Sequence, residues 1–436
     1  MLIINYYFYK TNNMSHKTIN CPIHGVITLT PRMCKIIDTP EYQRLHKLKQ
    51  LGATHHVYPS ATHTRFEHSL GVSYLAKVLL TSIKEKHPEF DIDDNFIELY
   101  QIAGLIHDIG HGPFSHLYDD EIIDQEKDMK HESRGINIFK DMVEKYSLSF
   151  DKREIDFIIE LIEPSKENEN NWKYQIINNK FCAIDVDKVD YIQRDCYYLG
   201  FGINQKFERL LTMCDIKTYV FTDEQAKTED VLAWPEKLQD EIISLFQTRY
   251  RLHKQVYTHH TVKAVEQIVS KILFEIKKST DIDLSTSYDD IISFPYKNEI
   301  IKNLQRQLDF RQHPRLIGEE TITIKTGLDP NPKLEISFIK LKKIVKTLNG
   351  NGIPNSGIIS AKIGFISGDG GNPLEMVPYF KKENHNAYKT SNYSSFMAPK
   401  NCQEYIYRIY VLNKTDVVKA KNIWDTIKKN ENELKD

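Results

Sequence analysis

The stretch GLIHDIGHGPFSH, residues 104–116, contains three histidines and an aspartate where an apolar helical pattern meets glycine and proline. Adjacent residues on a helix point roughly 100° apart, so the pair His107 and Asp108 cannot enclose a metal ion alone. At the end of a helix, however, both side chains can turn toward one ion while other helices supply further ligands. Imidazole nitrogen together with carboxylate oxygen suits Mn, Fe, Zn or Mg, so the stretch predicts a metal-binding helix end.

Two other predicted helices offer candidates for the missing ligands. His68 lies near the start of the helical pattern 65–86, and Asp187 lies near the start of the pattern 185–200. Taken singly, His68 is simply a surface histidine, and Asp187 is a residue that favours a helix N-terminus without any metal. Together with His107 and Asp108 they form two histidines and two aspartates on three helices, and this set favours a divalent metal site.

The overall composition is that of a globular chain with near-neutral charge. Its 436 residues are enough for one large domain or two smaller ones, and 40% of them are hydrophobic. The net charge of −2 gives no global cationic field, so a polyanionic ligand needs a local basic site, and nucleic acid is not indicated as a partner. Six cysteines without a CxxC pair, no apolar run of membrane-spanning length and no signal sequence predict an intracellular protein, in the cytoplasm or nucleus, without a membrane partner.

Helical periodicity dominates from about residue 30 to about residue 275. The patterns predict helices at 39–52, 65–86, 95–110, 131–146, 153–163 and 185–200, and one long helical stretch, broken once, at 237–278. After residue 280, β-branched and aromatic segments predict strands at 321–325, 357–367, 373–380 and 404–412, and a closing helix at 416–430. We therefore expect a mostly α fold, with an N-terminal segment at 1–30, a helical core at 31–280 and a smaller α+β lobe at 281–436.

Two stripes of polar residues recur at helical spacing. Arg249, His253 and Tyr257 follow one another at i, i+4 and i+8, and so do Asp187, Tyr191 and Asp195. A stripe of this composition is not a core stripe. A solvated face with i,i+4 pairs is the simpler alternative, but two such stripes in one chain favour a polar binding cleft.

The segments PIHGVITL, HTRFEHSLGVSYLA, GLIHDIGHGPFSH and DVDKVDYIQRDCYYLG resemble, in the same order, those of the HD-domain metal phosphohydrolases. The resemblance is closest to the eukaryotic SAM-and-HD-domain deoxynucleoside triphosphate triphosphohydrolases, and it runs from about residue 17 to about residue 265. We expect the SAM domain itself to be absent. The resemblance implies an HD core with its motif region at about 63–200 and a C-terminal lobe used for oligomerisation or regulation.

The resemblance also implies a reaction and roles for the remaining cleft residues. The metal ligands are the four residues His68, His107, Asp108 and Asp187. Water activated by the metal attacks the α-phosphorus of a dNTP, which releases a deoxynucleoside and inorganic triphosphate. The 5′ oxygen is a poor leaving group and needs a general acid, for which an imidazole is suited. We expect this acid to be His116, oriented by Asp119, with His131 or His111 as the second choice. From sequence alone, His131 is equally well an ordinary residue at a helix N-terminus.

Further positions match substrate contacts of that family. The residues that correspond to phosphate contacts are Arg65, Lys188 and Arg249. Those that correspond to the deoxyribose side are Gln50, Leu51, Asp195 and Tyr257. Tyr191 and His253 complete the two polar stripes. A tight apolar and aromatic fit at C2′ would exclude the ribose hydroxyl and favour deoxynucleotides.

The family is activated by guanine nucleotides that bridge subunits into a tetramer. Residues matching a first effector site, for GTP or dGTP, are Lys17, Asn20, Asp38 and Gln43. Residues matching a second site are Val57, Tyr58, Arg209 and His259. Several basic or acidic family positions differ, because this chain has Cys21, His46, Gln255 and His260. Basic side chains hold effector phosphates. We therefore expect a homo-oligomer, a dimer or tetramer, with reduced or absent dependence on GTP.

Two other functions fit parts of the pattern. An HD phosphohydrolase could act on another nucleotide, such as a monophosphate or a second messenger, but the stripe Arg249, His253 and Tyr257 favours a triphosphate. A non-catalytic scaffold for nucleotides or nucleic acid would tolerate loss of the metal set and the cleft histidines. Because this chain retains all of them, the enzyme is the favoured interpretation.

Overall fold

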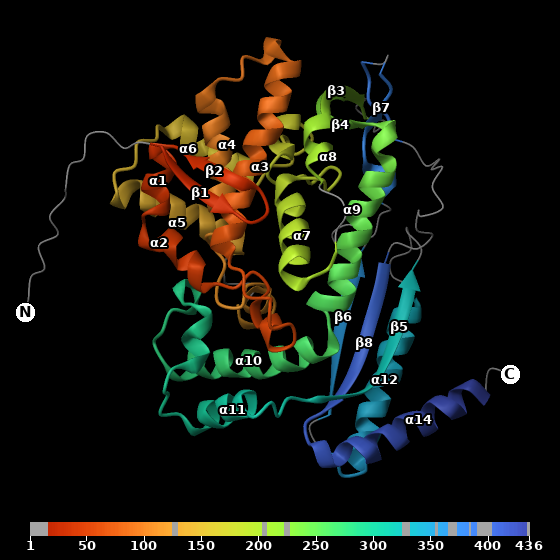
Figure 1. Ribbon diagram of the computed structural model, residues 1–436. Helices are drawn as coiled ribbons and strands as arrows, with labels where there is room; N and C mark the ends of the chain where they lie inside the picture. Colours follow the sequence, from red (N-terminus) through yellow and green to blue (C-terminus); the bar gives the residue numbers. More distant parts are fainter. Residues whose placement is uncertain are drawn as a thin grey trace, which may run out of the picture.

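The computed structural model describes residues 16–123, 130–202, 207–221, 227–324, 332–353, 356–364, 373–382, 385–389 and 403–433. Within these ranges the chain is mostly helical, as expected from the sequence, and it contains three small sheets (Figure 1). Residues 1–15 of the N-terminal segment expected at 1–30 lie outside the described residues.

Five helices form the bundle that carries the histidines and aspartates (Figure 1). They are α3 (Arg65–Lys86), α4 (Asp94–Ile106), α5 (His131–Lys145), α6 (Lys152–Ile162) and α7 (Val186–Leu199). Helix α3 packs on α4 and on α7, and the buried apolar faces of all five belong to one core. The helices predicted in these regions are confirmed, except that α4 ends at Ile106 and not at the predicted residue 110. Gly200 ends α7 in the left-handed conformation that glycine adopts easily.

The N-terminal part begins with an antiparallel hairpin of β1 (Lys17–Cys21) and β2 (Gly25–Leu29), followed by α1 (Pro31–Ile37) and α2 (Pro40–Gln43). Thr39 caps α2 as expected, but the helix predicted at 39–52 is wrong beyond residue 47. There the chain leaves the helix and pairs with the segment before α3, because the Gln50 amide donates to the His63 carbonyl at 3.0 Å and Lys49 bridges to Thr64.

The long helical stretch predicted at 237–278 is broken once, as expected. It consists of α9 (Gln239–Leu252), a π-helical turn (His253–Tyr257) and α10 (His260–Ser279). Before it, α8 (Glu208–Met213) leads into the unpredicted hairpin of β3 (Asp215–Val220) and β4 (Thr228–Pro235). The strand predicted at 373–380 is wrong: Pro373, a residue suited to the first helical turn, begins the short helix α13 (Pro373–Met376), and only β7 (Tyr379–Phe380) pairs with β4.

The C-terminal part contains α11 (Glu299–Asp309), β5 (Arg315–Ile324), α12 (Pro332–Gly350), β6 (Gly357–Gly364), β8 (Gln403–Val411) and α14 (Val417–Glu433). The antiparallel sheet has the order β5–β8–β6 and builds a core of its own with α12 and α14. Helix α11 instead packs against α10, where Ile301 joins a second apolar cluster. The strands predicted in β5, β6 and β8 and the closing helix are confirmed, α12 was not predicted, and the domain boundary near 280 stays a prediction.

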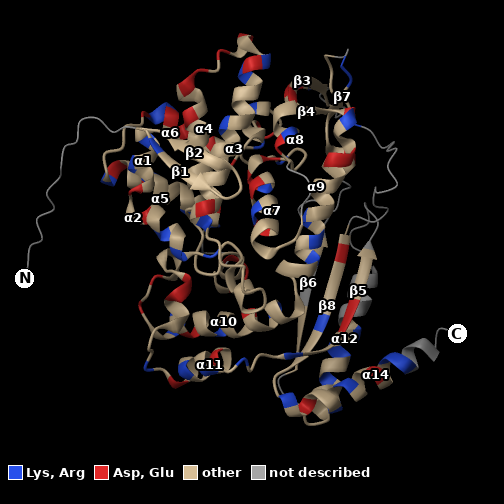
Figure 2. Cartoon of the chain, in the orientation of Figure 1, with Lys and Arg blue, Asp and Glu red and all other residues tan. Residues whose placement is uncertain are grey.

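Short helical turns complete the chain at Pro88–Phe90, Tyr118–Ile122, Trp172–Gln175, Glu236–Leu238, Leu284–Thr286, Asp289–Ser293 and Lys414–Asp416, in addition to Arg44–Lys47 and Gly52–His56. Across the described parts of the chain, we find no helix whose length and apolar character would let it cross a membrane. Figure 2 shows basic and acidic residues intermixed along the outer helices, in agreement with the net charge of −2.

Candidate metal centre

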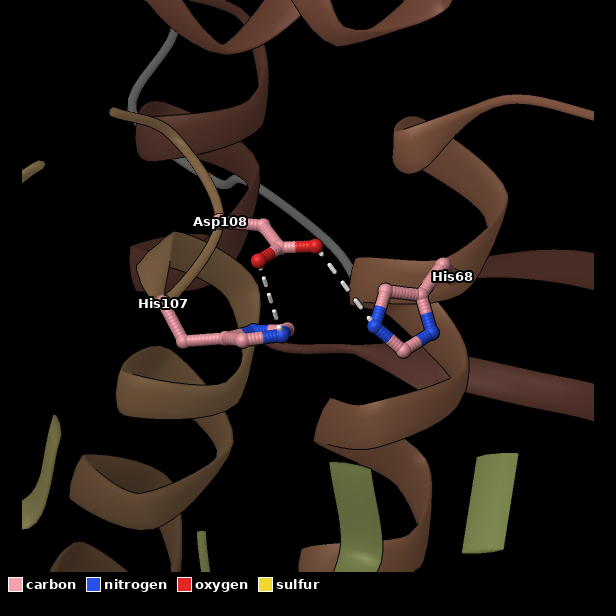
Figure 3. A group of neighbouring side chains, drawn as sticks. All are labelled: His68, His107 and Asp108. Atoms are coloured by element: carbon pink, nitrogen blue, oxygen red, sulfur yellow. Dashed lines mark ion pairs between the residues drawn. The ribbon is translucent and has the colours of Figure 1, made fainter. Parts of the chain in front are cut away.

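The pair that follows α4 meets a histidine of α3 inside the bundle. Figure 3 shows the Asp108 carboxylate between the rings of His68 and His107. One carboxylate oxygen of Asp108 lies 3.6 Å from His68 Nε2, and the other lies 3.5 Å from His107 Nε2. Ligand atoms of these three buried or nearly buried residues all lie within 4.8 Å of one another, a spacing that suits coordination of one ion.

Asp187, in the first turn of α7, completes the predicted set. Its Oδ1 lies 3.0 Å from His68 Nε2 and 3.6 Å from His107 Nε2. The helix cap itself is Asp185, whose side chain accepts from the Lys188 amide. Asp187 is therefore not needed as the cap, and its carboxylate is available to a ligand.

The two imidazole nitrogens that face this point lack hydrogen-bond partners. Nε2 of His68 and Nε2 of His107 are both buried and make no hydrogen bond among the described residues. Burial alone would lower the pKa of His68, but the carboxylates of Asp187 and Asp190 raise it to about 10. Unsatisfied buried nitrogens beside carboxylates fit a divalent cation, which would replace the proton that these groups otherwise attract.

Asp190 supports the centre from behind and was not predicted. It is fully buried and accepts from His68 Nδ1 at 2.8 Å and from His24 Nε2 at 2.6 Å. Arg194 donates to the same carboxylate through Nε and Nη2, both at 2.9 Å. A carboxylate on the far nitrogen fixes the ring and directs Nε2 toward a metal. The signal for it was the i,i+4 pair of Asp190 and Arg194 in α7.

Arg65 joins the metal centre to the loop of histidines. Its guanidinium pairs with Asp108 through Nη1 and donates to Ser115 Oγ through Nε at 2.8 Å. The Arg65 charge, together with His107 and His111, overcomes burial and holds the pKa of the Asp108 carboxyl well below its usual range. Arg65 was expected at a phosphate, and in the structure its side chain also neutralises a candidate ligand.

The cleft histidines form a group with Asp119, but not as expected. The rings of His111 and His131 stack with centroids 3.9 Å apart, and Asp119 Oδ2 lies 3.3 Å and 3.1 Å from their Nδ1 atoms. The expectation that Asp119 orients His116 is wrong for this structure. The π-helical turn Tyr118–Ile122 and an ion pair with Arg134 of α5 direct the carboxylate toward the stacked pair.

His116 lies at the edge of this group. Its ring meets that of His111 edge-on, with centroids 5.5 Å apart, and its side chain is exposed to the cleft. Loss of hydration inside the cleft, together with the neighbouring His111 and Arg65, lowers the pKa of His116. The ring is therefore neutral near pH 7.

All nine residues expected at the substrate line one cleft of about 480 Å³, which is also lined by His68, Asp108 and Asp187 of the candidate metal set and by His111, His116 and His131. The nine are Gln50, Leu51, Arg65, Lys188, Tyr191, Asp195, Arg249, His253 and Tyr257. Lys263 and Glu266 of α10 also line the cleft and were not predicted; they pair with each other at 2.7 Å.

Hydrogen bonds connect the two polar stripes across the cleft. The Tyr257 hydroxyl donates to Asp195, and Arg249 Nε donates to the Tyr191 hydroxyl at 3.1 Å. His63, which was not predicted, holds the other oxygen of Asp195 at 2.7 Å. Burial, reinforced by the charge of Asp195, raises the pKa of Tyr257 well above its ordinary value. Tyr257 therefore remains a neutral hydroxyl, and the pair forms a rigid wall.

The expected effector residues lie in separate places. Lys17 and Asp38 form an exposed ion pair at 3.2 Å, and Asn20 and Gln43 are exposed as well. Among the residues of the second expected site, the ring of Tyr58 meets that of His259 at 5.8 Å, and Val57 precedes it.

Two residues of this expected network have partners inside the chain. Arg209 pairs with Glu241 of α9. His46 stacks on Phe66, with ring centroids 3.6 Å apart and an interplanar angle of 18°.

Comparison with known proteins agrees with this geometry. A family model described as HD domain matches residues 65–195. A Dictyostelium discoideum protein named deoxynucleoside triphosphate triphosphohydrolase SAMHD1 homolog is 30% identical over 442 residues, which cover 97% of this chain and 82% of that protein. Homo sapiens deoxynucleoside triphosphate triphosphohydrolase SAMHD1 is 30% identical over 451 residues, covering 90% and 70%. The Mus musculus protein of the same name is 35% identical over 316 residues, covering 64% and 48%. The chain thus spans about half the length of several relatives that it matches, including the mouse protein.

Proposed function

The chain belongs to the HD-domain family of the SAMHD1 deoxynucleoside triphosphate triphosphohydrolases, and from this premise we propose that it hydrolyses dNTPs to deoxynucleoside and inorganic triphosphate. The observation that carries the proposal is one cleft where three candidate metal ligands, His68, Asp108 and Asp187, meet three further histidines and the nine expected substrate residues; the fourth ligand, His107, lies 3.5 Å from Asp108. Its geometry brings together groups that lie far apart in the sequence.

The metal set would be His68, His107, Asp108 and Asp187. When bound, a divalent cation there supplies the activation of water for attack on phosphorus. Mn, Fe, Zn and Mg all accept this mixture of nitrogen and oxygen donors. Asp190 holds the His68 ring from its Nδ1 side, at 2.8 Å, so that Nε2 stays directed at the cation.

The other cleft residues would bind and orient the substrate and move a proton. Arg249 and Lys188 place positive charge in the cleft, although Lys188 is already paired with Asp185 at 2.7 Å. Attack at the α-phosphorus breaks its bond to the 5′ oxygen, and His116 would donate the proton that this oxygen needs. The negative charge of a bound triphosphate would oppose the lowering of the His116 pKa and favour the protonated ring. His111, His131 and Asp119 would hold this end of the cleft in place.

The fixed pair of Tyr257 and Asp195, with Leu51 on the same cleft, would select the sugar. A rigid wall at C2′ leaves no room for a ribose hydroxyl, so the proposed substrates are deoxynucleotides. A nucleotide monophosphate or second messenger remains the alternative substrate, and the products decide between them.

We further propose that the protein forms a homo-oligomer with little or no dependence on GTP or dGTP. Lys17 and Asp38 persist for a first effector, but His46 is stacked on Phe66 and carries no permanent charge. Gln255 and His260 stand where the family has basic residues, and losing two charge-assisted phosphate contacts would weaken the binding of a second effector by roughly two orders of magnitude or more. Sedimentation of nucleotide-free protein and the rate against GTP concentration test this. Assembly and activity that both require GTP and dNTP would contradict it.

Product chromatography tests the proposed reaction. The pure protein is incubated with each dNTP, with and without GTP, and inorganic triphosphate is the expected product. Alanine at His107 or Asp108 should remove the metal and abolish turnover, while alanine at the exposed His385 should change neither. Monophosphate with pyrophosphate would contradict cleavage of the bond between the α-phosphorus and the 5′ oxygen. A metal-loaded protein that hydrolyses no dNTP would favour the alternative substrates or a binding role.

A further inference from the structure

A buried aspartate outside the matched HD domain connects two walls of the cleft. Asp289 begins the short helical turn Asp289–Ser293, far along the chain from residues 65–195, and is only 4% exposed. Its Oδ1 accepts from the Phe114 amide at 2.7 Å, and its Oδ2 accepts from the Lys49 amide at 2.8 Å. One carboxylate therefore satisfies two backbone donors from different segments.

The two amides belong to the two segments that would handle the substrate. Lys49 directly precedes Gln50 and Leu51, which line the sugar side of the cleft. Phe114 lies two residues before His116. The segments also touch each other, because a Cβ added to Gly52 would lie 3.3 Å from the Phe114 carbonyl oxygen. A shift of either segment would therefore change the spacing between residues 49–52, called the sugar wall below, and the histidine segment, residues 110–116.

The histidine segment has a backbone that needs such support. Phe114 and Ser115 are consecutive non-glycine residues in the left-handed region, with φ of 59° and 53°. Strained conformations of this kind persist only when the surroundings fix them from several sides. Arg65 holds Ser115 from inside the cleft, and Asp289 holds Phe114 from outside.

A second contact reinforces the same connection. The buried guanidinium of Arg44 donates to the carbonyls of Ile109 and His111, at 2.7 Å and 2.8 Å. It also donates to the Ser287 carbonyl at 3.1 Å, two residues before Asp289. The chain around Asp289 is thus attached to the start of the histidine segment through Arg44 and to its later part through the Phe114 amide.

We propose that Asp289 is a positioning residue that sets the distance between the sugar wall, residues 49–52, and the histidine segment, residues 110–116. The expected effect on turnover rests on the proposed function, because Asp289 acts through Leu51 and His116 and touches no substrate. Its effect on the backbone does not depend on any activity. Asp289 should therefore influence the rate and the discrimination between deoxyribose and ribose together.

The test compares Asp289→Asn with Asp290→Asn. Asparagine has the shape of aspartate but only one acceptor oxygen, so one of the two amides loses its acceptor. We expect the dNTP kcat/KM to fall roughly ten- to a hundred-fold and the preference for dNTP over NTP to narrow, with metal content unchanged. The exposed neighbour Asp290 makes the matched control, and Asp290→Asn should behave as wild type.

Hydrogen exchange keeps the inference separate from the proposed activity and from the folding of the variant. In the wild-type protein without nucleotide, the amides of Lys49 and Phe114 should both be protected, and Asp289→Asn should speed exchange in at least one of their segments. Fast exchange of both amides in the wild type would overturn the inference. So would an unchanged preference for dNTP in an Asp289→Asn variant whose rate has fallen. If the wild-type protein hydrolyses no dNTP, the proposed function fails, but the exchange result still decides the role of Asp289.

Discussion

Replacing Asp190 by asparagine should separate the support of the metal centre from the ligands themselves. Asp190 touches no candidate metal position, yet its fully buried carboxylate accepts from His68, His24 and Arg194. Asparagine preserves the shape but presents an amino group to at least one of these donors. The His68 ring then loses the acceptor that fixes its tautomer and leaves Nε2 facing the ion.

Two magnitudes follow from these contacts. Loss of an outer carboxylate on a ligating histidine typically weakens metal binding by about 10–100-fold, or about 1.4–2.7 kcal/mol. Breaking a buried ion pair leaves the Arg194 charge uncompensated, which costs about 3–5 kcal/mol of the free energy of unfolding. A protein with a typical unfolding free energy of about 5–15 kcal/mol would survive this in most cases.

Two assays and a second variant resolve the two effects. Metal affinity is measured by competition with a chromophoric chelator, and stability by urea unfolding of metal-free protein. The double variant Asp190→Asn/Arg194→Met removes the stranded charge, so stability should partly recover while metal affinity stays low. Asp94→Asn, at a fully exposed carboxylate, is the control and should change neither quantity. Wild-type metal affinity in a folded Asp190→Asn protein would refute this account of the centre.

Three further outcomes follow from the structure. Gly71→Ala should lower the unfolding free energy by roughly 1–3 kcal/mol and weaken metal binding, because the added Cβ would lie 1.9 Å from Asp190 Oδ1. Urea unfolding measures the first effect and chelator competition the second. Wild-type values of both would contradict the close packing of Gly71 on Asp190. Asp119→Asn should lower kcat roughly ten-fold or more without changing metal content, since His111 and His131 lose the negative charge that both face. Steady-state kinetics with metal analysis checks this, and wild-type kcat would argue against it. In the His56→Gln variant, the free energy of unfolding should fall less than in the wild type when the pH is lowered from about 6.5 to about 4. Burial and the positive charges of His55 and Arg311 lower the pKa of His56 to about 4 in the folded state, so there the unfolded chain binds the extra proton and stability falls as pH falls. Urea unfolding at about pH 7.5 and about pH 5 measures the difference, roughly 1–2 kcal/mol, and equal pH dependence in both proteins would count against it.

Local patterns predicted much of the fold correctly. Apolar spacing places α3, α5 and α7 within a residue or two, and Asp185 and Gly200 cap the two ends of α7. The helix predicted at 39–52 ended early because residues 48–50 pair with 63–65, and a contact between segments leaves no local pattern. The strand predicted at 373–380 failed for a related reason, since only two of its residues reach the edge of β4.

The candidate site likewise contains residues that local sequence could predict and contacts that it could not. The motif residues could be found because their spacing repeats on helices and because the segments resemble a known family. Asp190 was within reach, since it stands four residues before Arg194 on α7. The true partners of Asp119 and the two amides held by Asp289 depend on side chains that meet across the fold. Such long-range pairings are decided by packing, which a single sequence does not display.

The π-helical turn His253–Tyr257 makes the length of this stretch a structural constraint. The Thr258 amide bonds back to the His253 carbonyl, five residues earlier, at 2.9 Å, so the turn holds one residue more than an α-helical turn. Deleting one residue there would shorten the turn that leads from α9 to His259, the extended residue that caps α10. The start of α10, with Lys263 and Glu266 on the cleft, would then be displaced from its present place. Homologous chains should therefore vary in length before α9 or after α11, and hardly ever between Arg249 and Lys263.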